Sequence, residues 1–245
     1  MDFCSVLCKR FNIEKPADEG TAESYGKAMY SFAESGWDCN SRMGLDCYNY
    51  AWVDLNALLF GMERDMAFFS AELKNGCEAM CSERAENRRS LMTKLLWNDE
   101  SGAFCDYNFT NGRQARVISA AQFYPLFSGV YTKEQAERTV ELLSEIEAEF
   151  GVACCEKRED LYGLQWDYPN GWACLQYIVV HGLLRYGYRK EALRIAEKYK
   201  SLDEYFADEN REHFPEYSEY VYHDIRFTIT DRFIQRYKKD SNKSL

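Results

Sequence analysis

The amino-acid sequence predicts an all-α fold built from consecutive pairs of helices. Its apolar residues recur at spacings of three and four, the period of one helix face, and almost never alternate over the length of a strand. Short polar turns such as Asn75-Gly76 separate successive helical segments, which favours helices that fold back on one another. No fixed internal repeat is visible, so a repeat array is not supported. We therefore expect stacked α/α hairpins.

Each helix is predicted from its own apolar stripe and end signals. In residues 54–73 the stripe contains Leu55, Leu58, Leu59, Met62, Met66 and Phe69. Thr132 followed by Gln135 is a capping-box pattern at a helix start. The predicted helices cover residues 25–35, 54–73, 77–97, 119–128, 132–150, 171–186, 189–208 and 228–237, with a short extended piece at 103–107.

The 245 residues are expected to form one domain. No Pro/Ser-rich linker interrupts them, so we place the domain at residues 22–237. Residues 1–21 are predicted to be an irregular N-terminal segment, and residues 238–245 a frayed basic tail.

Charge and hydropathy exclude several classes of partner. Thirty basic against forty acidic residues give a net charge of −10, which argues against nucleic-acid binding because that requires a cationic surface. The longest apolar runs are shorter than the roughly 20 residues that span a bilayer, so no membrane partner is expected.

The ten cysteines do not follow the pattern of a small secreted disulfide scaffold. The chain is long and its start has no long apolar core, so we expect reduced cysteines and a cytoplasmic location. With three histidines and no CxxC pairs, no metal site is expected either.

The first segment with potential chemistry is AESGWDCNSR, residues 33–42. Gly36 is suited to end the preceding helix in a left-handed conformation, which places Asp38 just beyond the helix beside Trp37. A carboxyl group next to an apolar ring loses hydration, and this favours the protonated form that a general acid needs. The alternative is that Asp38 only caps the next turn.

A second segment, QWDYPNGW at residues 165–172, is dense in aromatic, amide and carboxyl groups. Trp166 and Trp172 offer apolar faces that suit a sugar ring, and Asn170 could cap the following helix. The alternative is a helix-entry turn whose tryptophans fill the core. His181, on a helix that is apolar nearly all round, is expected to be a core residue.

A third segment, residues 212–220, carries Glu216 and Glu219 between aromatic residues. Either carboxylate could act as a base. Exposed acidic residues in a chain this acidic are usually only solvated, which is the alternative.

At these same residues the sequence resembles the trehalase family of glycoside hydrolases. AESGWDCNSRM is similar to the family's AESGWDFSSRW segment, and QWDYPNGWACLQ to its QWDxPNGWAPLQ signature. DLNALLF, LWNDESGAFCDYN and AAQFYPLFSG follow in the family's order, so the likeness covers most of residues 22–199. The resemblance implies part of an α/α toroid, an inverting glycosidase mechanism, and neither metal nor cofactor.

The resemblance also assigns roles to individual residues. The family's general acid falls on Asp38, and its base falls on or within one residue of Glu216, with Glu219 as the fallback. Substrate-binding residues carried over from the matched segments are Glu23, Gly36, Trp37, Gln165, Trp166, Asp167 and Trp172.

Two departures from the family pattern bear on activity. Thr21 stands where the family has an arginine that could hold sugar hydroxyls or a carboxylate, so specificity for trehalose is open. The family's first signature, PGGRFxExYxWDxY, has no counterpart, and half of the toroid would then be absent. Helices at such a seam would expose apolar stripes, so we expect a partner, either a second copy of this chain or a complementary N-terminal half.

The sequence therefore predicts a cytoplasmic, trehalase-like inverting glycosidase that acts on trehalose or a related α-glucoside, a small carbohydrate. Two alternatives stay open. One is a catalytically impaired sugar-binding remnant or a half-enzyme that needs a partner chain, and the other is a structural helical interaction protein.

Overall fold

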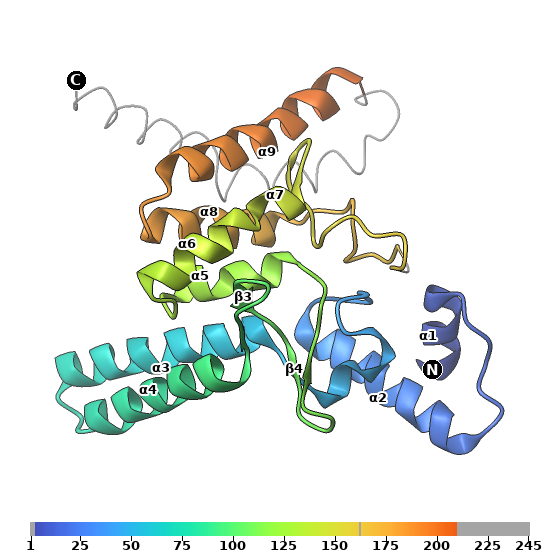
Figure 1. Ribbon diagram of the computed structural model, residues 1–245, viewed down its shortest axis with the longest axis horizontal. Helices are drawn as coiled ribbons and strands as arrows, with labels where there is room; N and C mark the ends of the chain where they lie inside the picture. The colour runs from blue at the N-terminus through green and yellow to red at the C-terminus, as the bar shows by residue number, and fades with distance from the viewer. Residues whose placement is uncertain (1–2, 162, 210–245) are drawn as a thin grey trace.

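The computed structural model describes residues 3–161 and 163–209, and it confirms an all-α fold of paired helices (Figure 1). The helices are α1 (Phe3–Phe11), α2 (Glu19–Ser35), α3 (Val53–Leu73), α4 (Glu78–Leu95), α5 (Tyr124–Ser128), α6 (Lys133–Glu141), α7 (Leu143–Ile146), α8 (Ala173–Arg185) and α9 (Arg189–Glu209). Two short 3-10 helices, η1 (Gly44–Asn49) and η2 (Ala120–Phe123), join them. The predicted helix 228–237 and the tail 238–245 lie outside the described residues.

The strands are all two residues long and serve as clips between helices. β1 (Tyr50–Ala51), β4 (Tyr107–Asn108) and β5 (Arg113–Gln114) form one antiparallel sheet in the order β1-β4-β5. Two hairpins pair β2 (Trp97–Asn98) with β3 (Ala103–Phe104) and β6 (Glu147–Ala148) with β7 (Gly151–Val152). The extended piece predicted at 103–107 is therefore present as β3 and the start of β4.

The helices pack as a stack in which α5 lies between the α3–α4 hairpin and the α8–α9 hairpin (Figure 1). The predicted α3–α4 hairpin is confirmed with its Asn75-Gly76 turn. Lys74 (φ 52°) and Gly76 (φ 80°) supply the left-handed backbone that reverses the chain.

Helix α8 is the helix that the sequence predicts to be apolar nearly all round. Leu175, Val179 and Leu183 on it are fully buried. At Gly182 a side chain would begin 2.9 Å from Cβ of Leu126, so glycine permits the close contact between α8 and α5. His181 is half-buried, with its ring centroid 4.2 Å from that of Tyr177.

The prediction of an irregular segment at residues 1–21 is wrong. Leu7 and Phe11, four residues apart, are buried and give α1 an apolar face, and the Phe11 ring stacks on Phe32 of α2 with centroids 5.7 Å apart. Helix α2 also begins earlier than predicted, because Asp18 caps it by accepting a hydrogen bond from the backbone N–H of Thr21 at 2.8 Å.

The continuous helix predicted at 132–150 is divided into α6 and α7 and ends at Ile146. Its capping box is confirmed, since Thr132 and Gln135 exchange side-chain to backbone hydrogen bonds. After α7 the chain turns back as the β6–β7 hairpin, in which Gly151 has a positive φ of 109°. Gln176 of α8 holds this hairpin by bonding both backbone groups of Val152, at 2.8 and 2.7 Å. A tertiary contact therefore decides the local structure.

Candidate active site

The first segment, at residues 36–42, begins where α2 ends. Gly36 takes the predicted left-handed conformation (φ 75°), and Ser35 Oγ accepts a hydrogen bond from the N–H of Trp37 at 3.0 Å. Trp37 is 3% exposed, while Asp38 beside it is half-buried. The helix end thus anchors the aromatic ring in the core and leaves the carboxyl group within reach of solvent.

The second segment meets the first although they are far apart in the sequence. Asp167, 1% exposed, accepts hydrogen bonds from Ser41 N (2.8 Å), Ser41 Oγ (2.5 Å) and Leu164 N (2.9 Å). The N–H of Trp166 also donates to the carbonyl of Cys39 at 3.3 Å. Asp167 was predicted to bind substrate, and the structure places it as the buried anchor between the two loops.

Three tryptophans extend this junction as a stack. The Trp166 ring lies 5.1 Å from the Trp37 ring and 4.9 Å from the Trp172 ring, nearly parallel to the latter. The facing sides of the Trp166 and Trp172 rings therefore cover each other, while both residues stay partly exposed. The predicted cap at Asn170 is wrong, because its side-chain amide donates to the carbonyl of Leu164 at 3.1 Å and Trp172 stands at the N-cap of α8.

A buried ion cluster lies beneath the first segment. The Arg42 guanidinium donates two hydrogen bonds to Asp54 (3.0 and 3.1 Å) and two to Asp106 (2.5 and 2.6 Å), with all three side chains buried. Burial opposes the charge of Arg42, yet Asp106 and Asp54 outweigh it and raise the arginine pKa. The guanidinium also lies over the Trp37 and Trp52 rings, at 4.9 and 5.2 Å. This cluster fixes the segment that carries Asp38 to the start of α3.

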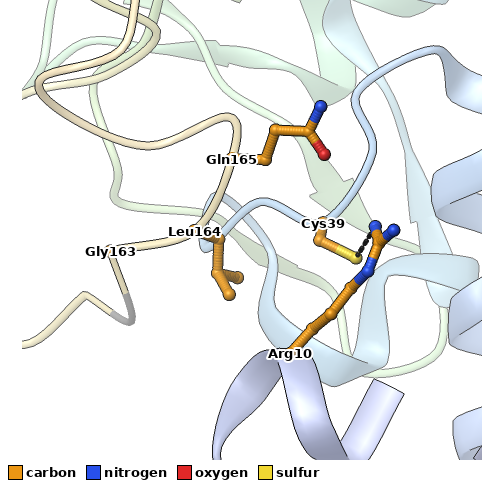
Figure 2. Close-up of a pocket in the computed structure, with 5 residues that line it drawn as sticks. All are labelled: Arg10, Cys39, Gly163, Leu164 and Gln165. Atoms are coloured by element: carbon orange, nitrogen blue, oxygen red, sulfur yellow. Dashed lines mark hydrogen bonds between the residues drawn. The ribbon is translucent and has the colours of Figure 1, made fainter. Parts of the chain in front are cut away.

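A pocket of about 340 Å³ opens between the two segments (Figure 2). Its lining residues are Arg10, Cys39, Gly163, Leu164 and Gln165. Arg10 reaches over from α1 and donates to Cys39 Sγ at 3.2 Å. That hydrogen bond raises the pKa of Arg10, and the negative charge of Asp38 acts in the same direction. Arg10 and Gln165 thus give the pocket a guanidinium and an amide, groups that suit sugar hydroxyls, and Asp38 directly precedes Cys39 of its lining.

Glu23, another predicted site residue, does not line this pocket. Glu23 lies on the exposed face of α2, where it pairs with Lys27 at 2.8 Å, and this ion pair lowers the pKa of Glu23. Glu216 and Glu219 lie outside the described residues. Among the side chains that the structure describes, in residues 4–161 and 163–202, no group of three His, Cys, Asp or Glu could hold a metal ion.

Sequence reasoning missed Arg42 and Arg10. A signal for Arg42 was available, because an arginine in a segment predicted to pack beside tryptophan needs buried acidic partners. For Arg10 the sequence held no such signal, since α1 was not recognised.

The described residues form an all-α protein of paired helices, in which two loops meet at a polar pocket near Asp38. A family model described as Trehalase matches residues 14–218, which is most of the chain. The chain therefore belongs to the trehalase family.

Individual relatives agree with this assignment. The chain is 34% identical over 191 residues to a periplasmic trehalase from Xanthomonas oryzae pv. oryzae, covering 74% of this chain and 33% of the relative. It is 36% identical over 187 residues to the cytosolic neutral trehalase of Saccharomyces cerevisiae, covering 68% of this chain and 24% of that relative. The solved structure of neutral trehalase Nth1 from S. cerevisiae superimposes with a TM-score of 0.70 at 31% identity, covering 85% of this chain and 44% of that one.

The structural match confirms that the fold is part of an α/α toroid. The chain spans about a third or less of the two curated relatives and under half of the solved structure. Their names place relatives in both the periplasm and the cytosol. In the part of the chain that the structure describes, no helix is long and apolar enough to cross a membrane.

Proposed function

We propose that this chain hydrolyses trehalose or a related α-glucoside with inversion of configuration. The observation that carries the proposal is the meeting of the two family segments, because Gln165 of the second and Cys39 of the first line one pocket with Arg10, and Cys39 directly follows the half-buried Asp38. Membership of the trehalase family supports the reaction class.

In the proposed mechanism Asp38 is the general acid and protonates the glycosidic oxygen as the leaving sugar departs. Glu216, or Glu219 in its place, is the base that takes a proton from water as that water attacks the anomeric carbon from the opposite face. In inverting glycosidases the two carboxyl groups stand roughly 6.5 to 9.5 Å apart, which leaves room for the water.

The acid is tested with Asp38→Asn. We expect hydrolysis of trehalose to be lost while the midpoint of thermal unfolding stays nearly unchanged, since Asp38 is only half-buried. Glu34→Gln, an exposed acidic residue four positions earlier, is the matched control and should retain activity. Unaltered turnover in Asp38→Asn would remove this residue from the mechanism.

The base is tested separately. Glu216→Ala should be inactive towards an α-glucosyl fluoride and regain turnover with azide, which replaces the activated water. Full activity in Glu216→Ala together with loss in Glu219→Ala would transfer the role to Glu219.

A second candidate is a sugar-binding remnant, or a half-enzyme that needs a partner chain. Thr21 in place of the family's arginine and the short span relative to the curated trehalases favour it. Calorimetry with trehalose distinguishes it from the enzyme. Saturable binding without glucose release after long incubation would favour the remnant, and glucose release by the isolated chain would exclude it.

We also propose a cytoplasmic location. No disulfide joins any of the ten cysteines, all of which lie in the described residues, and seven of them are buried. This supports a reducing compartment, because disulfides persist mainly in oxidising ones.

A further inference from the structure

The pocket between the two loops contains polar groups that the protein itself leaves largely unused. In the part of the chain that the structure describes, Cys39 Sγ is the only hydrogen-bond acceptor of the Arg10 guanidinium, at 3.2 Å. Within the same residues the side-chain amide of Gln165 has no hydrogen-bond partner. Both side chains are exposed, so a ligand in the pocket is able to contact them.

The guanidinium of Arg10 has more donors than its one contact uses. A guanidinium carries five N–H donors, and a thiol is only a weak acceptor. Figure 2 shows the Arg10 side chain extending from α1 towards Cys39. Gln165 adds an amide that both donates and accepts hydrogen bonds. A sugar hydroxyl does the same, so these two residues together match a ligand rich in hydroxyl groups.

Both residues are held in place by their neighbours along the chain. Arg10 directly precedes Phe11, whose buried ring stacks on a phenylalanine of α2 at 5.7 Å between centroids. Gln165 directly precedes Trp166, whose N–H donates to the carbonyl of Cys39 at 3.3 Å. Little backbone ordering is therefore needed when a ligand binds, which favours affinity.

Cys39 makes room for the guanidinium. The family's segment AESGWDFSSRW has phenylalanine where AESGWDC of this chain has Cys39. In the same rotamer a phenylalanine ring would extend past the position of Sγ, into the space that the guanidinium occupies 3.2 Å away. Cys39 also has a left-handed backbone (φ 51°), a conformation that is rare for non-glycine residues and recurs at ligand-binding sites.

A comparison with Arg42 separates a structural arginine from a binding one. Arg42 is 3% exposed and makes four hydrogen bonds to the buried carboxylates of Asp54 and Asp106. Arg10 is exposed, and among the described residues no carboxylate accepts a hydrogen bond from it. Its donors therefore face the pocket, whereas those of Arg42 hold the fold together.

We propose that Arg10 is a substrate-binding residue that donates to sugar hydroxyls in the pocket, and that Cys39 makes room for its guanidinium. The inference rests on the proposed function, because it adds a residue to the same site. Arg10 lies before residue 14, where the family match begins, so membership of the family does not supply this role.

The test is the affinity of the full chain for trehalose, measured by calorimetry. Arg10→Met keeps an unbranched side chain but removes all five donors, and it should weaken binding by about tenfold or more. Lys9→Met is the matched control, because Lys9 is an exposed cation of the same helix that does not line the pocket. Its affinity should equal that of the wild type.

The role of Cys39 is tested with two substitutions. Cys39→Ser keeps the space and an acceptor, so it should bind trehalose nearly as well as the wild type. Cys39→Phe should weaken binding as Arg10→Met does, and the double variant should be no weaker than either single one, because both act on the same guanidinium. Wild-type affinity in Cys39→Phe would overturn the role of Cys39.

Urea unfolding separates binding from structure. If Arg10→Met lowers the unfolding midpoint but leaves the affinity for trehalose unchanged, Arg10 only ties α1 to the first loop and the inference is overturned. A wild-type chain that does not bind trehalose overturns it as well. A chain that binds trehalose, loses affinity in Arg10→Met and releases no glucose supports the binding role of Arg10 while refuting the proposed hydrolysis.

Discussion

Replacement of Asp167 by alanine tests whether this carboxylate anchors the two loops of the pocket. It is 1% exposed and accepts three hydrogen bonds, from Ser41 N, Ser41 Oγ and Leu164 N, at 2.5 to 2.9 Å. Hydrogen bonds to a charged group contribute about 1.5–3 kcal/mol each, and alanine would also leave two backbone N–H groups buried without partners. Since such contributions are not additive, we expect Asp167→Ala to lower the free energy of unfolding by about 4 kcal/mol.

Urea unfolding followed by circular dichroism measures this loss. The midpoint should fall while the slope with denaturant stays the same, because the surface exposed on unfolding hardly changes. Asp160→Ala is the control, since Asp160 lies in the same loop but forms only a surface ion pair with Arg158 and should cost less than about 1 kcal/mol. A loss below about 1 kcal/mol in Asp167→Ala, with sugar binding abolished, would refute the anchor role and restore the substrate-binding role predicted from the sequence.

Two further predictions concern buried ionisable groups. Arg42→Met should cost about 3–5 kcal/mol in urea unfolding, because Asp54 and Asp106 would remain buried without their cation; a cost under about 1 kcal/mol would contradict the cluster's role. Burial lowers the pKa of His181, so the native state holds it neutral while the unfolded chain takes up a proton near the ordinary value of about 6.5. The contribution of neutral His181 to stability is therefore present above about pH 6.5 and is lost as the pH falls. In His181→Gln the melting temperature should fall less steeply with pH over this range. If the melting temperature of His181→Gln depends on pH as that of the wild type does, groups other than His181 cause the loss of stability at low pH.

The helices that could be predicted from the sequence are those whose apolar period is long and uninterrupted. Helix α3 was located to within one residue of its ends, and the capping box at Thr132 was correct because it depends only on neighbouring side chains. The β6–β7 hairpin that follows α7 could not be predicted, since it is held by Gln176, a residue of α8 that bonds Val152 across a tertiary contact.

The sequence predicted the two loops that form the candidate site, but not how their side chains are arranged. The residue types in the two segments indicated sugar chemistry, and the structure brings the segments together. Whether a given side chain anchors or binds depends on burial. Asp167 and Trp166 turned out to be packed against the first loop, whereas Gln165 between Leu164 and Trp166 lines the pocket. Adjacent residues thus differ in role, one anchoring the loops and the next lining the pocket, and the residue types alone do not show which role each residue has.

Proton donation by Asp38 in an inverting hydrolysis, as we propose, can be followed by proton magnetic resonance of trehalose during turnover, because the anomeric signals of the first glucose released report the stereochemistry. We expect α- and β-glucose to appear in equal amounts before mutarotation, one from the leaving sugar and one from the inverted sugar, and neither to appear with Asp38→Asn. Release of α-glucose alone, or an undiminished rate in Asp38→Asn, would contradict it.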